Sequence, residues 1–503
     1  MLSLLILIPI LGATITMLVS NGTIAKRVSL LCLSVVVILT LYIAREFTIT
    51  DGHFQFSETY QWINLIGLDY SLGIDGISLP LIGLNMLICW LIVFAYDANS
   101  HRARSFLALL LLANAGLTGA FASTNVLLFT IFYELELIPI YLLIAIWGSV
   151  KREYAATKFL IFTAVSGILI LVGFLAVGWF AANPNPTFNY ESLLHTNFPV
   201  AVQTILLLIL LVGFGIKTPL VPLHTWLPDT YVESSTSTAM LLGGLLAKLG
   251  AYGLLRFCMP LFPDAWHTLA PFLALWGGLG ILYGAFTAIA QKDIKRMVAY
   301  SSIGHMSYIL LAIAADNPLS LVGAVSQMVS HGLILALLFY LVGIVEAKVG
   351  TREIDILNGL MNPIRGLPTT SALLILSGMA SAGIPGLVGF VAEFITFQGS
   401  YTQFPVPTIM AIAGTGLTAV YFVILLNRTC FGKLDNRTAY YPKVSGVEQI
   451  PALVLTALII WLGVQPSHLI SWSEATAQVY SQYTVANAGL MPIRLDSSQI
   501  AIK

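Results

Sequence analysis

Long apolar runs separated by short polar stretches dominate this chain of 503 residues. A membrane-spanning helix needs about 20 consecutive, mostly apolar residues, and most of the runs are close to that length. The pattern therefore predicts an all-α polytopic membrane protein with about 14 transmembrane helices. The expected helices cover approximately 2–19, 27–45, 77–96, 105–122, 124–147, 155–180, 201–231, 236–258, 269–290, 298–314, 319–345, 369–401, 405–429 and 449–470.

The composition agrees with this pattern and removes several classes of function. Apolar residues make up 58% of the chain and charged residues 9%, whereas soluble globular proteins are about 25% charged. A water-facing surface cannot be built from so few charges, which excludes a soluble enzyme, a nucleic-acid-binding protein and a disordered chain. No basic residue precedes the run at 2–19, so we expect a retained first helix rather than a cleaved signal peptide.

The four cysteines do not indicate a metal site. Cys32, Cys89, Cys258 and Cys430 are far apart and lack CxxC or Cys/His ligand spacing, so neither zinc nor an iron–sulfur cluster is expected. The sequence also contains no nucleophile elbow, phosphate-binding loop or dinucleotide fingerprint. We therefore expect no resident cofactor and no bond-forming chemistry on this chain.

Basic residues gather in alternate connections between the expected helices. Cytoplasmic loops of membrane proteins are enriched in Lys and Arg, so these connections are predicted to be cytoplasmic and both termini to lie on the opposite side. Arg45 and Arg256 are near the ends of other connections, Arg494 and Lys503 are in the tail, and 218–235 has no basic residue although it is predicted to be cytoplasmic. The residues that carry the alternation are Lys26, Arg27, Arg102, Arg104, Lys151, Arg152, Lys158, Lys292, Lys295, Arg296, Lys348, Arg352, Arg365, Arg428, Lys433, Arg437 and Lys443.

Two of the expected helices contain residues that interrupt a helix. The segment GFGIKTPLVPLHTWLPD has three prolines, and SGMASAGIPGLVGFVAEF has Pro385 flanked by glycines. Proline removes a backbone donor and clashes with the preceding turn, and broken backbone at membrane depth is tolerated only inside protein or beside water. Ordinary proline kinks are the alternative reading.

Broken helices at corresponding places in two halves are typical of transport pathways built from repeats. We therefore predict two inverted five-helix repeats, at 105–258 and 269–429, with the seventh and twelfth helices broken. Residues 1–104 would form the first three helices with a loop on the side of the termini, and 430–503 the last helix and a tail.

Two lysines remain after the basic connections are assigned, and both lie in expected helices. Lys217 ends the run AVQTILLLILLVGFGIK, and Lys248 is central in AMLLGGLLAKLGAYGLL. A cation at the centre of a membrane helix costs at least about 2.5–3.5 kcal/mol on insertion scales, which favours a proton carrier. The alternative for each is a side chain that reaches the membrane surface.

Buried acids accompany these lysines. Glu134 and Glu136 are in YELELIPIY, and residues two apart point to different faces of a helix. We predict that Glu134 lies opposite Lys217 as a pair whose charge state can switch. Glu393 follows the break in the twelfth helix, where the second half would place its counterpart of Lys217.

Three histidines and one aspartate complete the candidates. His305 and His331 occur on consecutive helices, between Lys248 and Glu393 in chain order. Imidazole exchanges protons near neutral pH through either ring nitrogen, so they could form a proton relay or be packing residues. His224 and Asp229 follow the seventh-helix break, where they could line a water path or cap the next connection.

Several stretches resemble the antiporter-like membrane subunits of respiratory and photosynthetic complex I: YELELIPIYLLIAIWG, KTPLVPLHTWLPD, LLAKLGAYGLLRF, QKDIKRMVAYSSIGHMSY and SHGLILALLF. The resemblance covers roughly residues 75–430 and implies 14 helices with two inverted repeats. It also implies that Glu134, five residues before Pro139, carries protons together with Lys217, Lys248 and Glu393. Iron–sulfur clusters and plastoquinone would be on partner subunits.

Finer features of the resemblance suggest a subtype. Glu393 in GFVAEF is similar to subunit 4 (D/M-type), whereas other antiporter-like subunits and the Mrp D subunit are expected to have Lys there. The motifs YELELIPIY, YAATKF and HTWLPD resemble those of the cyanobacterial and plastid version of this subunit. This resemblance implies a thylakoid NAD(P)H/ferredoxin:plastoquinone oxidoreductase, in which both termini of this chain are lumenal. LPDTYVESS departs from the common LPDAHGEA, and Tyr231 replaces an imidazole, as expected of a variant for carbon dioxide uptake that also has a carbon dioxide-hydrating partner subunit.

Two other functions fit the same pattern. An Mrp-type cation/proton antiporter would have the same fold, and Glu393 and the co-purifying subunits distinguish it from a complex I subunit. An inactive structural subunit is the second alternative, but a scaffold has no use for the costly buried lysines.

Overall fold

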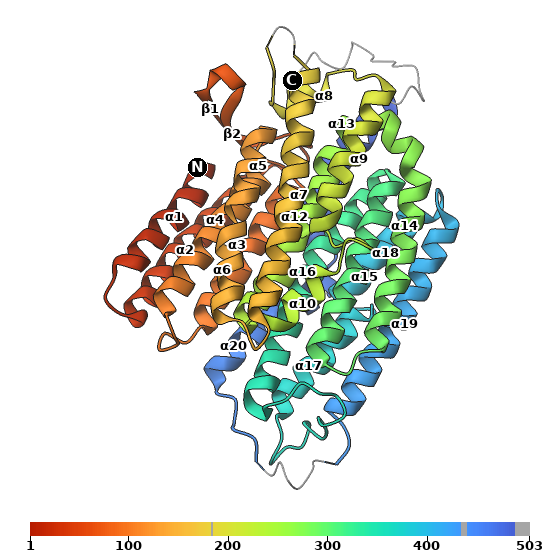
Figure 1. Cartoon of the computed structure of the whole chain (residues 1–503). Helices are drawn as coiled ribbons and strands as arrows, with labels where there is room; N and C mark the ends of the chain where they lie inside the picture. The colour runs from red at the N-terminus through yellow and green to blue at the C-terminus, as the bar shows by residue number, and fades with distance from the viewer. Residues whose placement is uncertain (183–184, 434–439, 488–503) are drawn as a thin grey trace.

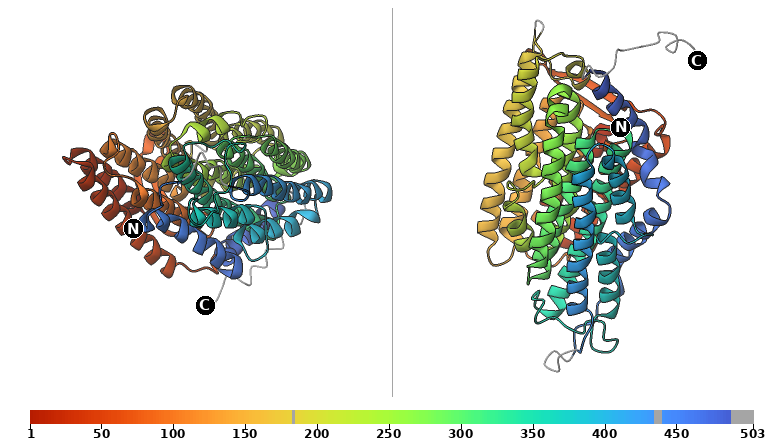
Figure 2. Two further views of the ribbon diagram at one scale, coloured as in Figure 1. Left: turned by 90° about the horizontal axis from the view of Figure 1, so that it is seen from below. Right: turned by 90° about the vertical axis from the view of Figure 1, so that its right-hand side faces the viewer.

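The computed structural model describes residues 1–182, 185–433 and 440–487. Of the basic residues used to assign the connections, Arg437, Arg494 and Lys503 lie outside these ranges. The chain forms a bundle of long helices that run roughly side by side, with a small β-hairpin at one end (Figure 1). Seen along the helices, α1 and α2 lie at one edge of the bundle and α19 at the opposite edge (Figure 2, left).

The elements, in chain order, are α1 (Leu2–Leu18), α2 (Gly22–Glu46), β1 (Gln55–Ile63), η1 (Asn64–Ile66), β2 (Leu68–Ile74), α3 (Ser78–Ala95), α4 (Ala103–Ala122), α5 (Val126–Leu135), α6 (Leu137–Trp147), α7 (Arg152–Phe180), α8 (Tyr190–Leu194), α9 (Val200–Lys217), α10 (Trp226–Glu233), α11 (Thr236–Leu241), η2 (Leu242–Leu246), α12 (Ala247–Gly253), η3 (Leu254–Cys258), α13 (Met259–Leu261), α14 (Pro263–Ile289), α15 (Ile294–Ala315), α16 (Pro318–Val349), α17 (Pro368–Ser381), α18 (Val388–Tyr401), α19 (Pro405–Thr429), α20 (Gly446–Val464) and α21 (Ser467–Asn487).

Twelve helical stretches among the described residues are long and apolar enough to cross a membrane. They include α5 with α6 as one stretch and α11 through α13 as another. The helix α1 is shorter, and the broken pair α17 and α18 consists of two 14-residue helices. The all-α membrane fold is therefore confirmed, while the total of 14 helices and the inverted repeats stay predictions.

Both predicted interruptions are present. Helix α9 ends at Lys217, and the chain becomes helical again only at Trp226, whose indole donates to the Ile216 carbonyl at 2.8 Å. Helices α17 and α18 are separated by 382–387, where Gly383 and Gly386 have φ angles of 69° and 91°. Positive φ is accessible to glycine at no steric penalty, which explains why this break contains two of them.

A third interruption was not predicted. The span that carries YELELIPIY divides into α5 and α6, and Glu136 is the single residue between them. The amide of Pro139 cannot donate a hydrogen bond, so the backbone around it is already short of helical hydrogen bonds. The break sets the direction in which the two carboxylates of this stretch point.

The centre of the bundle consists of two wholly buried spans. One is the 26-residue stretch Thr236–Leu261, in which the π-helical segments η2 and η3 flank α12. The other is α16, a 32-residue helix that packs against α15, α18, α20 and α21. Peripheral helices such as α2, α7 and α14 instead expose apolar side chains, as lipid contact requires.

The connections gather at two opposite ends, as the basic residues predicted. At one end Lys26 donates to the Tyr96 carbonyl at 2.7 Å, and Arg352 pairs with Asp293 at 3.1 Å, so connections predicted to be cytoplasmic contact each other. At the other end lie the β1–β2 hairpin, α8, α13 and α21. The side of the membrane that each end faces stays a prediction.

Two elements were not expected from the sequence. The polar gap at 46–76 contains the antiparallel hairpin β1–β2, with Tyr60 opposite Tyr70. The described part of the polar tail from 471 belongs to the 21-residue helix α21, which lies across the end of the bundle and contacts α13, α14, α16 and α20. Its Thr476 hydroxyl accepts a hydrogen bond from the Gly76 amide at 3.1 Å, which ties the tail to the start of α3.

Candidate functional site

The first buried charge pair joins two broken helices. The ammonium of Lys217, the last residue of α9, donates to Oε1 of Glu136 between α5 and α6. The two side chains are 1% and 0% exposed. The ammonium also lies 4.7 Å from the ring centroid of Tyr133, a cation–π contact that is strongest in a dry setting.

The predicted direct pair of Lys217 with Glu134 is wrong. Glu134 is half-buried and faces α7, where its carboxylate lies against Gly167; a methyl group added there would come 1.6 Å from Oε1. The reason is geometric, since residues two apart lie about 200° apart around a helix. Glu134 remains within electrostatic range of Lys217, so its predicted role in proton transfer stays open.

Lys248 lies in α12, at the centre of the wholly buried span Thr236–Leu261. Its ammonium donates to the carbonyl of Gly243 within η2, and no carboxylate pairs with it among the described residues. A π-helical turn lacks the usual i→i−4 hydrogen bonds and is frequent at functional sites. The η2 segment therefore provides the acceptor that the amine uses.

Glu393, His305 and His331 meet in one cluster. Glu393 Oε1 lies 3.6 Å from His305 Nδ1, and Glu393 Oε2 accepts a hydrogen bond from Thr415 at 2.9 Å. The two imidazole rings lie 5.3 Å apart between centroids. Ser381, the last residue of α17, is 3.1 Å from His305 Nε2. The break between α17 and α18 therefore places Glu393 beside both histidines.

This cluster encloses a cavity of about 10 Å³, which is room for about one water molecule. Glu393 Oε1, both ring nitrogens of His331 and the Gln327 side-chain oxygen are buried and have no hydrogen-bond partner within 1–182, 185–433 and 440–487. A buried water typically makes about three hydrogen bonds to such groups. One water here would connect a carboxylate to an imidazole. Lys248 lies within electrostatic range of both histidines, which links the span Thr236–Leu261 to this cluster.

His224 and Asp229 have different surroundings. His224 lies between α9 and α10 with Nε2 3.1 Å from the hydroxyl of Tyr283. Asp229, in the first turn of α10, pairs with Lys158 at 2.8 Å and Arg296 at 3.1 Å. The carboxylate thus belongs to an ion cluster at the basic end, whereas the imidazole contacts a phenol of α14.

Some residues in contact with the candidate site residues escaped the sequence analysis. Glu136 was visible in the motif but was assigned no role. Gln327, Ser381 and Thr415 are polar residues inside apolar runs, which was their only signal. Arg256 lies near the end of its span, as expected, but its side chain is 1% exposed and pairs with Asp75 inside the protein, which the sequence analysis did not predict.

The comparisons with known proteins agree with this geometry. Residues 123–418 match the family described as NADH:quinone oxidoreductase/Mrp antiporter, TM. The chain is 38% identical over 500 residues to "NAD(P)H-quinone oxidoreductase chain 4 1" of Synechococcus sp. (strain JA-2-3B'a(2-13)), covering 97% of this chain and 92% of the relative. It is also 38% identical over 462 residues to the chloroplast chain 4 of Cryptomeria japonica, covering 90% and 92%.

Two solved structures have the same fold. A chain of respiratory complex I from Thermus thermophilus with bound NADH superposes with a TM-score of 0.87 at 27% identity, covering 96% of this chain and 100% of that one. A chain of the Mrp complex from Dietzia sp. DQ12-45-1b gives a TM-score of 0.86 at 21% identity, covering 97% and 99%. The second comparison concerns the fold alone.

Proposed function

Because the chain belongs to the family of membrane subunits shared by NADH:quinone oxidoreductases and Mrp antiporters, we propose that it is the proton-translocating subunit 4 of a photosynthetic complex I. It performs no redox chemistry itself. Iron–sulfur clusters and plastoquinone belong to partner subunits, and the electron transfer there drives protons through this chain. Neighbouring antiporter-like subunits and the lipid membrane are its other partners.

A line of buried groups that can exchange protons carries this proposal. It runs from the Lys217–Glu136 pair, with Glu134 beside it, through Lys248 to the cluster of His305, His331 and Glu393. Charges inside a membrane protein are costly and mark ion or proton pathways. Because few of these groups touch one another directly, water completes the route, as at the cavity beside Glu393.

The route has a simple charge logic. Ionised Glu136 stabilises protonated Lys217. If either group is neutralised or moves away, the charge of the other group loses this stabilisation, and that group can exchange a proton. Lys248 has no anionic partner and accepts a proton only when one is driven to it. Glu393 carries a proton as a neutral acid, so the last transfer moves a proton from imidazole to carboxylate.

The experiment that tests this function uses the complex in membrane vesicles. Lys248→Met keeps the length of the side chain and removes its proton, so donor-driven proton pumping should fall to a small fraction of the wild-type rate at matched complex content. The matched control is Lys295→Met: Lys295 is also buried and also donates to a backbone carbonyl, that of Ser234, but it is at the basic end outside the route. Normal pumping by Lys248→Met would refute the function.

The subtype is part of the same proposal. Glu393 favours subunit 4 over an Mrp-type cation/proton antiporter. The sequences of the motifs YELELIPIY, YAATKF and HTWLPD support a thylakoid complex that oxidises ferredoxin or NAD(P)H. Tyr231, which is buried and donates to the Leu242 carbonyl at 3.0 Å, supports the variant for carbon dioxide uptake. Purifying the tagged chain tests both statements, because the variant should bring a carbon dioxide-hydrating subunit with it, and an Mrp subunit would bring no iron–sulfur proteins.

A further inference from the structure

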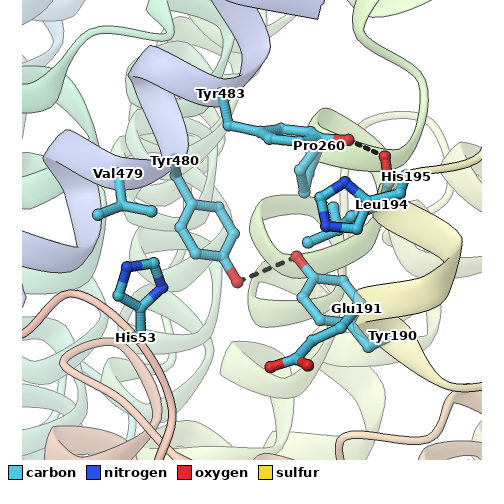
Figure 3. Close-up of a pocket in the computed structure, with 9 residues that line it drawn as sticks. All are labelled: His53, Tyr190, Glu191, Leu194, His195, Pro260, Val479, Tyr480 and Tyr483. Atoms are coloured by element: carbon cyan, nitrogen blue, oxygen red, sulfur yellow. Dashed lines mark hydrogen bonds between the residues drawn. The ribbon is translucent and has the colours of Figure 1, made fainter. Parts of the chain in front are cut away.

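A pocket opens at the end of the bundle that carries α21. Its volume is about 210 Å³, and it lies among α8, α13, α21 and the loop before β1 (Figure 3). The exposed histidines His53 and His195 and the carboxylate of Glu191 are on its wall. The pocket is large enough for several water molecules and therefore admits water from this side of the membrane.

Two phenols form the inner part of this pocket. The hydroxyl of Tyr190 donates to that of Tyr480 at 3.0 Å, and Figure 3 shows the two side chains facing one another from α8 and α21. Both rings are buried in the protein. The Tyr480 hydroxyl in turn accepts a hydrogen bond from Arg256. The guanidinium thus lies directly behind the phenols.

The guanidinium of Arg256 is held on every side. It binds Asp75 through two bonds, NH1 to Oδ2 at 2.6 Å and NH2 to Oδ1 at 2.7 Å. Its Nε donates to the Tyr252 hydroxyl at 3.0 Å. The rings of Phe54, Tyr252 and Tyr480 surround the cation, with centroids 4.9 to 5.3 Å from its central carbon.

This cation lies on the same span as Lys248. Eight residues separate Arg256 from Lys248, which corresponds to about 12 Å along a helix. Tyr252 lies midway between them and also donates to the Phe121 carbonyl at 3.0 Å. Along this span, Arg256 therefore lies between the inner end of the pocket and Lys248.

We propose that the Asp75–Arg256 pair is an electrostatic proton barrier, which separates this pocket from Lys248. A guanidinium keeps its protons at every physiological pH and has no acceptor atom, so it cannot pass a proton on. Its fixed positive charge also repels hydronium, as positively charged constrictions do in other pores. The inference rests on the proposed function in one respect, namely that Lys248 carries protons.

The barrier gives direction to the route. A proton on Lys248 cannot leave through the pocket among α8, α13 and α21, so it continues to His305, His331 and Glu393. Without the barrier, the gradient that the complex builds would drive protons back through the pocket to Lys248. Asp75 holds the guanidinium in place and prevents the penalty of an unpaired buried cation.

A purely mechanical role for the pair makes a different prediction. If Asp75–Arg256 only clamps α21 and α3 to the central span, removing either charge has the same effect. If the cation is the barrier, only loss of Arg256 opens the path. The test therefore compares Arg256→Gln, Asp75→Asn and the double variant, which keeps hydrogen-bonding groups without leaving an unpaired charge.

The measurement is the passive proton conductance of vesicles at matched complex content, with an imposed pH gradient and no electron donor. Arg256→Gln and the double variant should conduct about tenfold more than wild type, which corresponds to a barrier lower by about 1.4 kcal/mol. Asp75→Asn keeps the guanidinium and should stay near the wild-type value. Adding Lys248→Met to the double variant should remove most of the leak.

Two outcomes overturn the barrier. One is a double variant that assembles and has the passive proton conductance of wild type. The other is an Asp75→Asn variant whose conductance is as high as that of Arg256→Gln. The double variant decides the case if Arg256→Gln alone fails to assemble. Donor-driven pumping by Lys248→Met is measured separately, so failure of the barrier and failure of the proposed function give different results.

Discussion

Lys217, the last residue of α9, donates a hydrogen bond to Glu136, the single residue that separates α5 from α6. The pair therefore occurs where two helical stretches of the bundle are interrupted together. Removing one partner of a buried ion pair costs about 3–5 kcal/mol, because the other charge is left unpaired. Glu136→Gln should accordingly lower the amount of assembled complex, as measured by blue-native gels and subunit content.

The double variant Lys217→Gln/Glu136→Gln separates stability from transport. It leaves no unpaired charge, so the assembled complex should return toward the wild-type amount. Proton pumping per assembled complex should nevertheless stay low, because neither group can exchange a proton. Wild-type pumping by this variant would exclude the pair from the route.

Glu134 can be tested without changing it. A side chain at Gly167 would occupy the place of the Glu134 carboxylate, so Gly167→Ala should reduce pumping about as much as Glu134→Gln. The two changes together should be no worse than one, since both affect the same group. Gly416→Ala is the control, because an added methyl group there meets no atom within 4 Å. Fully additive losses would mean that Gly167 acts through something other than Glu134.

Glu393→Gln keeps the shape and most hydrogen bonds of the side chain but removes its proton exchange. Pumping should fall strongly while the complex still assembles, because the amide can still bind Thr415. Glu393→Asp should retain part of the activity if a water in the cavity bridges the gap that the shorter side chain leaves. Thr415→Val serves as control, since it removes the neutral donor to Glu393 Oε2 and should cause a smaller loss. Normal pumping by Glu393→Gln would show that protons bypass this residue.

The predicted topology can be measured with single cysteines. The four native cysteines are buried or half-buried, so a background without them should be tolerated. Asn99→Cys, in the exposed connection after α3, should react with an impermeant thiol reagent only from the cytoplasmic side. Ser192→Cys, in α8, should react only from the opposite side. If both react from one side, the helix assignment between these positions is wrong.

Asp316 should make the packing of α21 against the bundle sensitive to pH. It lies just after α15, its backbone carbonyl accepts a hydrogen bond from Ser481 of α21 at 3.2 Å, and its carboxylate is 3.6 Å from His267. Burial raises the pKa of this carboxyl from 3.8 to about 7. Because the carboxyl pKa is raised in the folded protein, protonated Asp316 stabilises the packing of α21 fully below about pH 4. This contribution to stability is lost as the pH rises through about 7.

Hydrogen exchange of the α21 amides measures this effect. After correction for intrinsic rates, protection should decrease between pH 5 and pH 8 in the wild-type protein. Asp316→Asn is neutral at every pH and should keep its protection nearly constant over that range. An equal pH dependence in both proteins would assign the effect to another group.

The sequence predicted the two broken helices because Pro219 and Pro222, and Gly383 with Pro385, exclude regular helix regardless of tertiary context. It also brought His305, His331 and Glu393 into one hypothesis, since ionisable residues in apolar runs have few acceptable places. The choice between Glu134 and Glu136 was not accessible in this way. It depends on the rotation of the chain at the α5–α6 break, which spacing from Pro139 does not encode.

Helix α21 and Arg256 were missed for a related reason. A helix such as α21, which seals the end of a bundle, is only moderately apolar, and its buried face is defined by the tertiary structure that it covers. Arg256 was given no partner, because its place near the end of an apolar run does not show what surrounds its side chain. Only the structure brings Asp75, 181 residues earlier, into contact with it.

The central span Thr236–Leu261 has a consequence for biogenesis. It carries both Lys248 and Arg256 and is enclosed by protein on all sides. Each of these charges disfavours partition of the nascent segment from the translocon into lipid. Asp75 is already synthesised when Arg256 emerges, but α16 and α21, which complete the enclosure, are not. The segment must therefore wait beside the earlier helices until the second half is made, and membrane integration of this chain is coupled to its folding.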